Sequence, residues 1–207
     1  MRVRDWAVVA VVMAGPAATA AIAGEAAFPQ RPVRFIVPFT PGSATDALAR
    51  TLAPKLTEAW GQQVVVDNRG GAGGTIGANL AAKSVPDGYT LVLNSASHAI
   101  NATLYSSLPY DTAKDFSGVT MVASVPNVLV VGQHVQAKTL KELIDTAKAK
   151  PGVLNYGSAG VGSASHLNGE LFSSAAGIRM VHVPFKGFAE QLVEIYAGRV
   201  EMTWAPQ

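Results

Sequence analysis

The sequence predicts an α/β fold in which parallel sheets are covered by helices. From Pro32 onward, short apolar stretches alternate with stretches whose apolar residues have helical spacing, and this alternation is typical of helices that connect parallel strands. Several turns between a strand and a helix are rich in glycine and small hydroxyl residues. With 207 residues, the chain can form one large domain or two modest ones.

The first half of the chain contains predicted strands and helices in alternation. Strands are expected at residues 33–39, 64–68 and 89–95, and helices at 45–60 and 76–82. Each strand is a short apolar run, and the longer helix has apolar residues near helical spacing. Pro54 lies inside this helix and cannot donate a backbone hydrogen bond, so a kink is expected there.

The second half repeats this alternation after an irregular connection. Residues 97–117 are expected to be irregular because Asn, Ser, Pro and Tyr interrupt them, and apolar runs on either side of Pro126 suggest a crossing between two lobes. Thr139 and Glu142 form a capping box at the start of a helix that should end at Pro151. Further strands are expected at 154–158, 179–185 and 200–204, and further helices at 163–176 and 189–196.

The N-terminal residues have the three-part layout of a secretory signal peptide. Arg2 and Arg4 precede an apolar run that is too short to span a bilayer comfortably, and small residues offer cleavage sites after Ala20 or Ala23. Residues 1–23 are therefore assigned to a signal peptide, and the mature chain is expected to be an exported, soluble protein. A membrane anchor or a buried helix is the alternative for this segment.

Composition excludes several classes of protein. The chain has no cysteine, which excludes disulfides, thiolate catalysis, a lipid-modified N-terminal cysteine and cysteine-ligated zinc. Loss of Arg2, Arg4 and Asp5 with the signal peptide would lower the formal charge from +2 to about +1. Because no basic run and no aromatic-interleaved stripe is present, no nucleic-acid partner is predicted.

Three turns between a strand and a helix have the composition of an anion site. They are TPGSATD at 40–46, NRGGAGGTIG at 68–77 and GSAGVGSASH at 157–166. At a helix start, several backbone amides have no intrahelical acceptor and the helix dipole adds positive potential, so an anion is a natural ligand. The alternative is ordinary capping by Ser, Thr and Asp without any ligand. Turns of this kind in both halves favour two lobes that clamp a small acid.

No motif indicates a cofactor, a metal or a catalytic centre. Neither the turn at 68–77 nor that at 157–166 completes a dinucleotide-binding fingerprint, and no P-loop motif is present. Ser163 and Ser165 lie outside any G-x-S-x-G motif, and the four histidines are too scattered for a local metal site. No cofactor, metal or enzymatic activity is therefore predicted. A serine hydrolase that uses one of these serines with a distant base stays as the alternative.

Several stretches in a fixed order resemble the periplasmic substrate-binding proteins of tripartite tricarboxylate transporters, often called the Bug family. The stretches are FIVPFTPGSATDALAR, VVVDNRGGAGGTIGA, PDGYTLVLNSASHAIN, LPYDTAKDFSGV, VPNVLVV, LNYGSAGVGSASHL and HVPFKG. The similarity extends from about Pro32 to the end of the chain. It implies a two-lobe periplasmic-binding-protein fold of type II (Venus flytrap), with residues 24–122 forming the N-terminal part of lobe 1 and residues 123–207 forming lobe 2.

The resemblance also implies a function. Such proteins are receptors in the periplasm that close on a small carboxylate and deliver it to the integral membrane subunits of the transporter. Their first loop between strand and helix, and the corresponding loop of lobe 2, hold carboxyl groups through backbone amides, hydroxyls and water. Carried over, the ligand-binding residues are Pro41, Gly42, Ser43, Thr45, Asp46, Ser95, Ser97, Ser158, Ala159, Gly162, Ser163 and His166. Asp46 is expected to accept hydrogen bonds from amides or water, because its carboxylate would repel an anionic ligand.

Two features depart from the family pattern. Ser43 follows Gly42 where the family commonly has a second glycine, which adds a hydroxyl and could shift ligand choice. Family members also continue well beyond the stretch VEMTW, whereas this sequence ends at Gln207. The first lobe is therefore expected to be incomplete and to expose apolar surface. A truncated remnant that binds no ligand is a further alternative.

Overall fold

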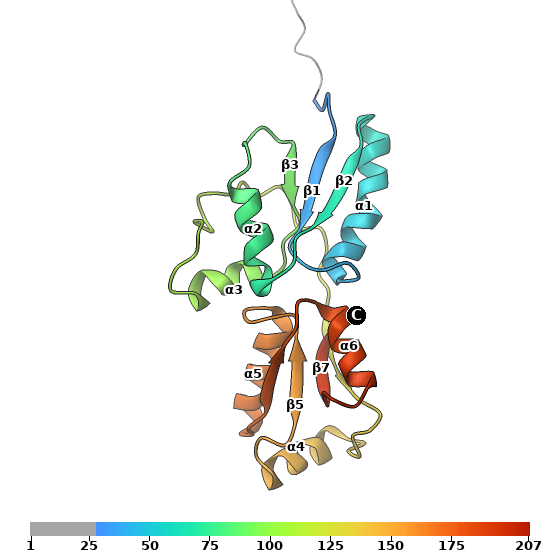
Figure 1. The fold of residues 1–207 in the computed structure, drawn as a ribbon, viewed down its shortest axis with the longest axis vertical. Coiled ribbons are helices and arrows are strands. Elements are labelled where there is room, and N and C mark those ends of the chain that lie inside the picture. Colours follow the sequence, from blue (N-terminus) through green and yellow to red (C-terminus); the bar gives the residue numbers. More distant parts are fainter. Residues whose placement is uncertain (1–27) are drawn as a thin grey trace, which may run out of the picture.

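The computed structural model describes residues 28–207, which form two α/β lobes stacked end to end (Figure 1). The upper lobe is built on a three-stranded sheet with the order β2-β1-β3, and the lower lobe on a four-stranded sheet with the order β4-β7-β5-β6. The predicted signal peptide lies outside the described residues. Within residues 28–207, no helix is long and apolar enough to cross a membrane.

Lobe 1 contains three parallel strands with helices on both sides. Its elements are β1 (Val33–Val37), α1 (Ala44–Trp60), β2 (Val64–Asn68), the 3-10 helix η1 (Ala72–Gly74), α2 (Thr75–Ala82), β3 (Thr90–Val92) and α3 (Ser97–Leu104). β1 is the central strand, with Val33 opposite Val64 and Phe35 opposite Leu91. α1 lies on one side of the sheet, and α2 and α3 lie on the other (Figure 1).

β1 also lies at the centre of the lobe 1 core. Val33, Ile36 and Val37 are fully buried, and the core cluster around this strand includes Ala49 and Ala53 of α1. Because burial of a valine or isoleucine side chain contributes about 1.5–3 kcal/mol, these contacts hold β1 firmly. The loop that follows β1 therefore starts from a fixed point.

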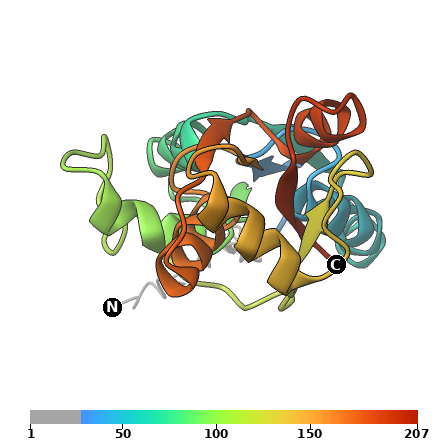
Figure 2. The same cartoon turned by 90° about the horizontal axis from the view of Figure 1, so that it is seen from below.

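Lobe 2 contains a mixed sheet and three helices. Its elements are β4 (Asn127–Val131), α4 (Leu140–Ala149), β5 (Asn155–Ser158), α5 (Ala164–Ala176), β6 (Val181–Pro184), α6 (Phe188–Tyr196) and β7 (Met202–Pro206). β5 pairs in parallel with β6 and β7, whereas β4 and β7 are antiparallel, with Leu129 opposite Trp204. α5 and α6 flank the sheet in Figure 1, and α4 crosses the end of the lobe that faces the viewer in Figure 2.

The predicted cap at the start of α4 is present, with Glu142 reaching back one residue beyond the capping Thr139. Thr139 Oγ1 accepts a hydrogen bond from the amide of Glu142 at 3.2 Å, and the Glu142 carboxylate accepts one from the amide of Lys138 at 2.7 Å. The capped helix packs Leu143 and Ala147 into the core of lobe 2, where both are buried. α4 is therefore fixed both by its cap and by its apolar face.

Two expectations about the fold were wrong. Residues 97–104 form α3 rather than an irregular segment. The sequence did not reveal this helix because its buried face carries the polar residues Ser97 and Asn101, so apolar residues do not recur at helical spacing. The second sheet is not purely parallel, because the last strand, β7, inserts between β4 and β5 and runs antiparallel to β4. Strand alternation alone does not reveal such an insertion.

The connection from lobe 1 to lobe 2 is residues 105–126, which contain no helix or strand. Val119 and Met121 in this connection are exposed to solvent. The chain then crosses back toward lobe 1 along β7, and its C-terminal end lies at the junction of the lobes (Figure 1). There the Gln207 amide donates a hydrogen bond to the Pro126 carbonyl at 3.0 Å.

Candidate functional site

The two lobes contain helix starts of nearly the same sequence. Residues 42–46 read Gly-Ser-Ala-Thr-Asp at the start of α1, and residues 162–166 read Gly-Ser-Ala-Ser-His at the start of α5. Their backbones agree as well: Gly42 and Gly162 both have a φ of 83°, and the serines that follow have φ values of −74° and −72°. Because a φ of 83° strongly favours glycine, the same turn is built twice with the same residues.

Each of these serines caps its helix. Ser43 Oγ accepts a hydrogen bond from the Asp46 amide at 3.2 Å, and Ser163 Oγ accepts one from the His166 amide at 3.3 Å. The serine carbonyl accepts the next amide of the helix, at 2.9 Å in lobe 1 and 3.1 Å in lobe 2. The two remaining amides of each first turn have no intrahelical acceptor. They belong to Ala44 and Thr45 in lobe 1 and to Ala164 and Ser165 in lobe 2.

Hydroxyl pairs accompany the free amides. Ser43 Oγ lies 3.1 Å from Thr45 Oγ1, and Ser163 Oγ lies 3.2 Å from Ser165 Oγ. All four side chains are buried. Ser165 Oγ also accepts a hydrogen bond from the Ala159 amide at 3.1 Å. The hydroxyl oxygens are therefore held in place by neighbouring groups rather than free to rotate.

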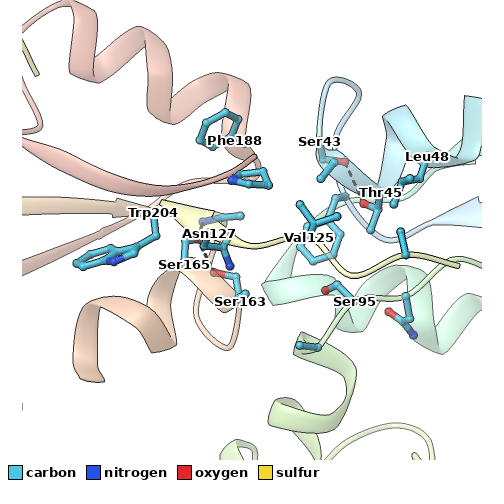
Figure 3. A pocket seen from close by; sticks show the side chains of 18 of the residues that line it. Ser43, Thr45, Leu48, Ser95, Val125, Asn127, Ser163, Ser165, Phe188 and Trp204 are labelled. Atoms are coloured by element: carbon cyan, nitrogen blue, oxygen red, sulfur yellow. Dashed lines mark hydrogen bonds between the residues drawn. The ribbon is translucent and has the colours of Figure 1, made fainter. Parts of the chain in front are cut away.

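A cavity of about 350 Å³ lies between the two helix starts. Figure 3 shows Ser43 and Thr45 on the lobe 1 side of this cavity and Ser163 and Ser165 on the lobe 2 side. All four residues with free first-turn amides line it. The other lining residues are Phe39, Leu48, Asn94, Ser95, Ala96, Ala123, Ser124, Val125, Asn127, Ala159, Phe188, Gln191, Trp204 and Pro206.

The chemistry of the lining is neutral. None of the described residues that line the cavity is charged; the polar groups are hydroxyls, carboxamides and backbone amides. The largest apolar side chains in the lining are Phe39 and Leu48 in lobe 1 and Phe188 and Trp204 in lobe 2. Positive potential in this lining therefore comes from helix starts, those of α1 and α5 and also that of α6, whose first residue is Phe188. Such helix dipoles favour anions.

The residues predicted to bind ligand fall into two groups. Ser43, Thr45, Ser95, Ala159 and Ser163 line the cavity, whereas the following residues do not: Pro41, Gly42, Asp46, Ser97, Ser158, Gly162 and His166. Several of the second group support the first. Ser97 Oγ, for example, lies 2.7 Å from Ser95 Oγ, and Gly42 and Gly162 supply the turn before each capping serine.

Asp46 holds the lobe 1 loop. Its carboxylate accepts hydrogen bonds from the Gly42 amide at 2.9 Å, from Asn68 Nδ2 at 3.0 Å and from Arg50 Nε at 3.0 Å. Burial alone would raise the pKa of Asp46, but the hydrogen bonds from Arg50, Gly42 and Asn68 outweigh it and lower this pKa below its ordinary value. Asp46 is therefore ionised at neutral pH, and its carboxylate accepts its hydrogen bonds from groups of the protein.

Ser158 and His182 form a pair behind the lobe 2 loop. Ser158 Oγ lies 2.5 Å from His182 Nε2 and accepts a hydrogen bond from the Gly160 amide at 3.1 Å. The His182 ring packs against the rings of Tyr156 and His166, with centroid distances of 4.9 and 4.2 Å. Burial, followed by the charge of His166, lowers the pKa of His182 to about 4. His182 is thus neutral at pH 7, and its Nε2 can accept a hydrogen bond from the Ser158 hydroxyl.

The hydroxyls in the cavity have no base beside them among residues 28–207. Ser163 and Ser165 bond to each other and to backbone amides, while the His166 ring accepts a hydrogen bond from the Gly162 amide at 3.3 Å. A serine nucleophile needs a base within hydrogen-bond reach. Within the described part of the chain, the serine hydroxyl that pairs with a histidine ring is that of Ser158, which is fully buried and does not line the cavity. The described residues also contain no group of three or more His, Asp or Glu that could hold a metal ion.

Several lining residues were not selected from the sequence. Asn127, Phe188, Gln191 and Trp204 were not among the predicted ligand-binding residues. They reach the cavity because β4, α6 and β7 meet at this end of the lobe 2 sheet. These residues could have been found from the sequence by the rule that ligands bind at the carboxyl ends of parallel strands. Trp204 lies near the carboxyl end of β7, and Phe188 lies just beyond that of β6.

Comparison with known proteins decides the family. The model of the tripartite tricarboxylate transporter family receptor (TctC) matches residues 48–206. The chain belongs to this family. As a TctC-family chain, it is 40% identical over 199 residues to protein BugT of Bordetella pertussis, covering 95% of this chain and 61% of BugT. The resemblance to the Bug family is thereby confirmed, and the chain spans about three fifths of the length of this relative.

Solved structures of TctC-family relatives have the same fold. R. palustris Rpa4515, solved with adipate, is 40% identical with a TM-score of 0.83, and the match covers 87% of this chain and 60% of Rpa4515. MatC from Rhodopseudomonas palustris, solved with bound malate, is 30% identical with a TM-score of 0.82, covering 86% of this chain and 61% of MatC. The predicted two-lobe periplasmic-binding-protein fold is confirmed by this agreement.

Proposed function

We propose that this TctC-family chain is a periplasmic receptor that binds a small carboxylate between its lobes and delivers it to the integral membrane subunits of a tripartite tricarboxylate transporter. One observation carries the proposal: two matched helix starts, one from each lobe, line the same cavity with free amides and buried hydroxyls. The adipate and malate in the two solved relatives are both small dicarboxylates. A ligand of this class fits the chemistry of the cavity.

The proposed mechanism uses dipoles instead of charged side chains. A carboxylate at each helix start would receive the two free amides and the neighbouring hydroxyls. Such a contact contributes up to about 2 kcal/mol per helix in a partly buried site. Closure of the lobes would remove water and strengthen these contacts, because electrostatic interactions grow as the local dielectric constant falls. The ligand itself would thus join the lobes.

The apolar side chains of the lining bear on the body of the ligand. Phe39, Leu48, Phe188 and Trp204 add hydrocarbon and aromatic surface to the cavity beside its polar groups. An aliphatic or aromatic segment would bury its surface there at about 25 cal/mol per Å². A polyhydroxylated ligand would instead leave hydroxyls without partners against these walls. An organic acid with an apolar body is therefore the proposed ligand class.

We propose different roles for the predicted site residues. Ser43, Thr45, Ser95, Ala159 and Ser163, together with Ala44, Ala164 and Ser165, are proposed to contact the ligand. The remaining residues are proposed to hold the loops that carry these contacts: Pro41, Gly42, Asp46, Ser97, Ser158, Gly162 and His166. The division of the chain into lobes at residues 122 and 123 is likewise a proposal, supported by sheets that fall on either side of it.

Binding without chemistry is the proposed activity. The relatives belong to a family of receptors, and the absence of a base beside Ser163 and Ser165 within residues 28–207 gives the hydrolase alternative no support. The receptor and the non-binding remnant differ in one property, which is affinity for an acid. That property can be measured directly.

Thermal shift and calorimetry with adipate test the proposal. Adipate is expected to raise the melting temperature, since a ligand that binds only the folded state at 100 times its Kd stabilises it by about 2.7 kcal/mol. Adipamide has the same carbon chain but no charge and serves as the matched control. A panel of aliphatic and aromatic acids, including malate, extends the search if adipate is not the preferred ligand.

The outcomes separate the alternatives. Stabilisation by an acid but not by its amide supports a receptor for carboxylates. Equal stabilisation by both compounds would show that the helix starts do not select charge. A chain that is folded but responds to no acid in the panel would be the non-binding remnant.

A further inference from the structure

The lobes touch each other next to the cavity, through residues that do not line it. Gly73 of η1 in lobe 1 lies against Val161 in the lobe 2 loop between β5 and α5. Thr40, which follows β1, lies against Gly187, which precedes α6. In both places a glycine allows the approach, because an added Cβ would overlap an atom of the other lobe. The contacts therefore belong to lobe closure rather than to the ligand surface.

The Gly73 contact is close and involves the backbone. A Cβ at Gly73 would overlap the Val161 carbonyl oxygen, and a Cβ at Gly160 would lie 3.1 Å from the Gly73 nitrogen. The Val161 carbonyl also accepts a hydrogen bond from the Tyr105 hydroxyl at 3.4 Å. Tyr105 directly follows α3 and is the first residue of the connection that leaves lobe 1. One carbonyl of lobe 2 is thus held between Gly73 of lobe 1 and Tyr105 at the edge of that lobe.

Asn101 connects this contact to the anion-binding loop. Its side chain is almost fully buried, and its Nδ2 donates a hydrogen bond to the Gly73 carbonyl at 3.0 Å. Its Oδ1 is buried without a hydrogen-bond partner among the described residues and faces Gly162, where an added Cβ would overlap it. The carboxamide therefore fixes Gly73 with one end and meets the turn before the Ser163 cap with the other.

This arrangement is unfavourable without a compensating interaction. An amide oxygen that is buried without a partner loses its hydration, and a Cα–H contact from glycine returns only part of that loss. Separation of the lobes would expose Oδ1 to water again. The closed arrangement is thus favoured only weakly by its own contacts, and a ligand that binds both helix starts can shift the balance.

We propose that Gly73, Asn101, Tyr105 and the loop 160–162 form an interlobe latch that holds the closed state of the receptor. The latch depends on the proposed function in one respect: closure must enclose the carboxylate. Gly73, Asn101 and Tyr105 are then positioning residues, because they contact the loop before Ser163 and do not line the cavity. Ligand retention would then depend on residues outside the ligand surface.

Gly73→Ala tests the latch with a matched control. Gly73 and Gly61 have nearly the same left-handed backbone, with φ values of 61° and 64°, so alanine carries the same conformational cost at either position. An added Cβ at Gly61 meets nothing within 4 Å, whereas at Gly73 it meets the other lobe. Both variants should lose a few degrees in Tm. Gly73→Ala alone should favour the open state.

Lobe separation is read by spin-label distances and affinity by calorimetry. The chain has no cysteine, so Glu58→Cys on α1 and Lys148→Cys on α4 give selective labelling of two exposed positions, one in each lobe. We expect Gly73→Ala to shift the distance distribution away from that of Gly61→Ala, with and without adipate. We also expect adipate affinity to fall about tenfold or more, because apparent affinity falls in proportion to the population of the closed state. Tyr105→Phe should shift both in the same direction by less, while keeping the fold.

The readouts separate the latch from the proposed function. Identical distance distributions for Gly73→Ala and Gly61→Ala would overturn the latch, even if affinity fell. A shifted distribution in a protein that binds no acid would support the latch and overturn the receptor function. A shift that also appears in Gly61→Ala would mean that backbone strain, not interlobe contact, opens the lobes, and would overturn the latch as well.

Discussion

A serine hydroxyl at a helix start can stabilise the helix, bind a ligand or do both. Ser163 caps α5 and lines the cavity, whereas Thr139 caps α4 at an exposed position away from it. Both accept a hydrogen bond from the amide three residues ahead. They therefore have the same local role and differ only in what surrounds them.

Ser163→Ala and Thr139→Ala are expected to separate stability from binding. Each should lower the free energy of unfolding by about 1 kcal/mol, the usual effect of a lost cap. Only Ser163→Ala should weaken binding of adipate, by about tenfold for one lost hydrogen bond to a charged group. Urea unfolding and calorimetry check the two effects. Equal affinities for the two variants would remove the Ser163 hydroxyl from the site.

His182 gives the stability of lobe 2 a pH dependence. Its folded-state pKa is about 4, against an ordinary value of 6.5, so between these values the unfolded chain binds a proton that the folded protein does not. The groups that face it are Ser158, Tyr156, His166 and Glu170. The neutral ring therefore contributes stability that is complete above pH 6.5 and is lost as the pH falls toward 4.

His182→Gln should flatten this dependence. The difference in free energy of unfolding between pH 7 and pH 5 should shrink relative to the wild type by about 1–2 kcal/mol. Urea titrations at several pH values measure it, and His134→Gln serves as the control because it replaces a histidine outside this cluster. An unchanged slope in His182→Gln would mean that His182 is not held neutral in the folded protein.

At the scale of elements, α5 packs onto β5 because residue 169 has no side chain. A Cβ at Gly169 would lie 2.6 Å from Cζ of Tyr156, a fully buried residue of β5. The Tyr156 hydroxyl bonds to the Glu170 carboxylate at 2.5 Å, which holds the ring in place. Helix propensity alone would favour alanine at position 169 by about 1 kcal/mol. Packing thus overrides propensity here.

Gly169→Ala is expected to destabilise the protein despite the better helix former. The clash should lower the free energy of unfolding by about 1–3 kcal/mol, the usual effect of overpacking. Ser174→Ala on the exposed side of the same helix is the matched control and should be neutral or slightly stabilising. Chemical denaturation compares the two. A more stable Gly169→Ala variant would contradict the packing argument.

At the scale of the whole molecule, the two lobes have separate cores. One core surrounds β1, and the other surrounds β5 and β7. Between them lie the cavity and the contacts of Gly73 and Gly187 with the opposite lobe. Cooperation between the lobes must therefore come from this junction, and a ligand that bonds to both helix starts would strengthen it.

The ligand is expected to couple the unfolding of the lobes. Scanning calorimetry should resolve two overlapping transitions in the free protein, because cores that share few contacts unfold separately. Saturating adipate should merge them into one transition at a higher temperature, while adipamide should leave them unchanged. A single transition in the free protein would show that the junction already couples the lobes.

The sequence by itself determined most of the elements and the two capped turns of the candidate site. Residue spacing placed β1, α1, β2, α4 and α5 within a few positions, because strand and helix periods are local properties. The turns at 40–46 and 157–166, like that at 68–77, were predicted as candidate anion sites for the same reason, since capping serines and left-handed glycines act within one turn of the chain.

Only the tertiary structure decided which residues meet. β7 pairs with β4 although the two segments lie about 75 residues apart in the sequence. The buried polar face of α3 is explained only by the fold, which places Gly73 and Gly162 against Asn101. Trp204 and Phe188 reach the cavity for the same reason. Contacts between distant segments depend on how the elements pack, and such packing produces no repeating pattern of residues in the sequence. The chain therefore encodes its two capped helix starts locally, and their opposition across one cavity arises only from the fold.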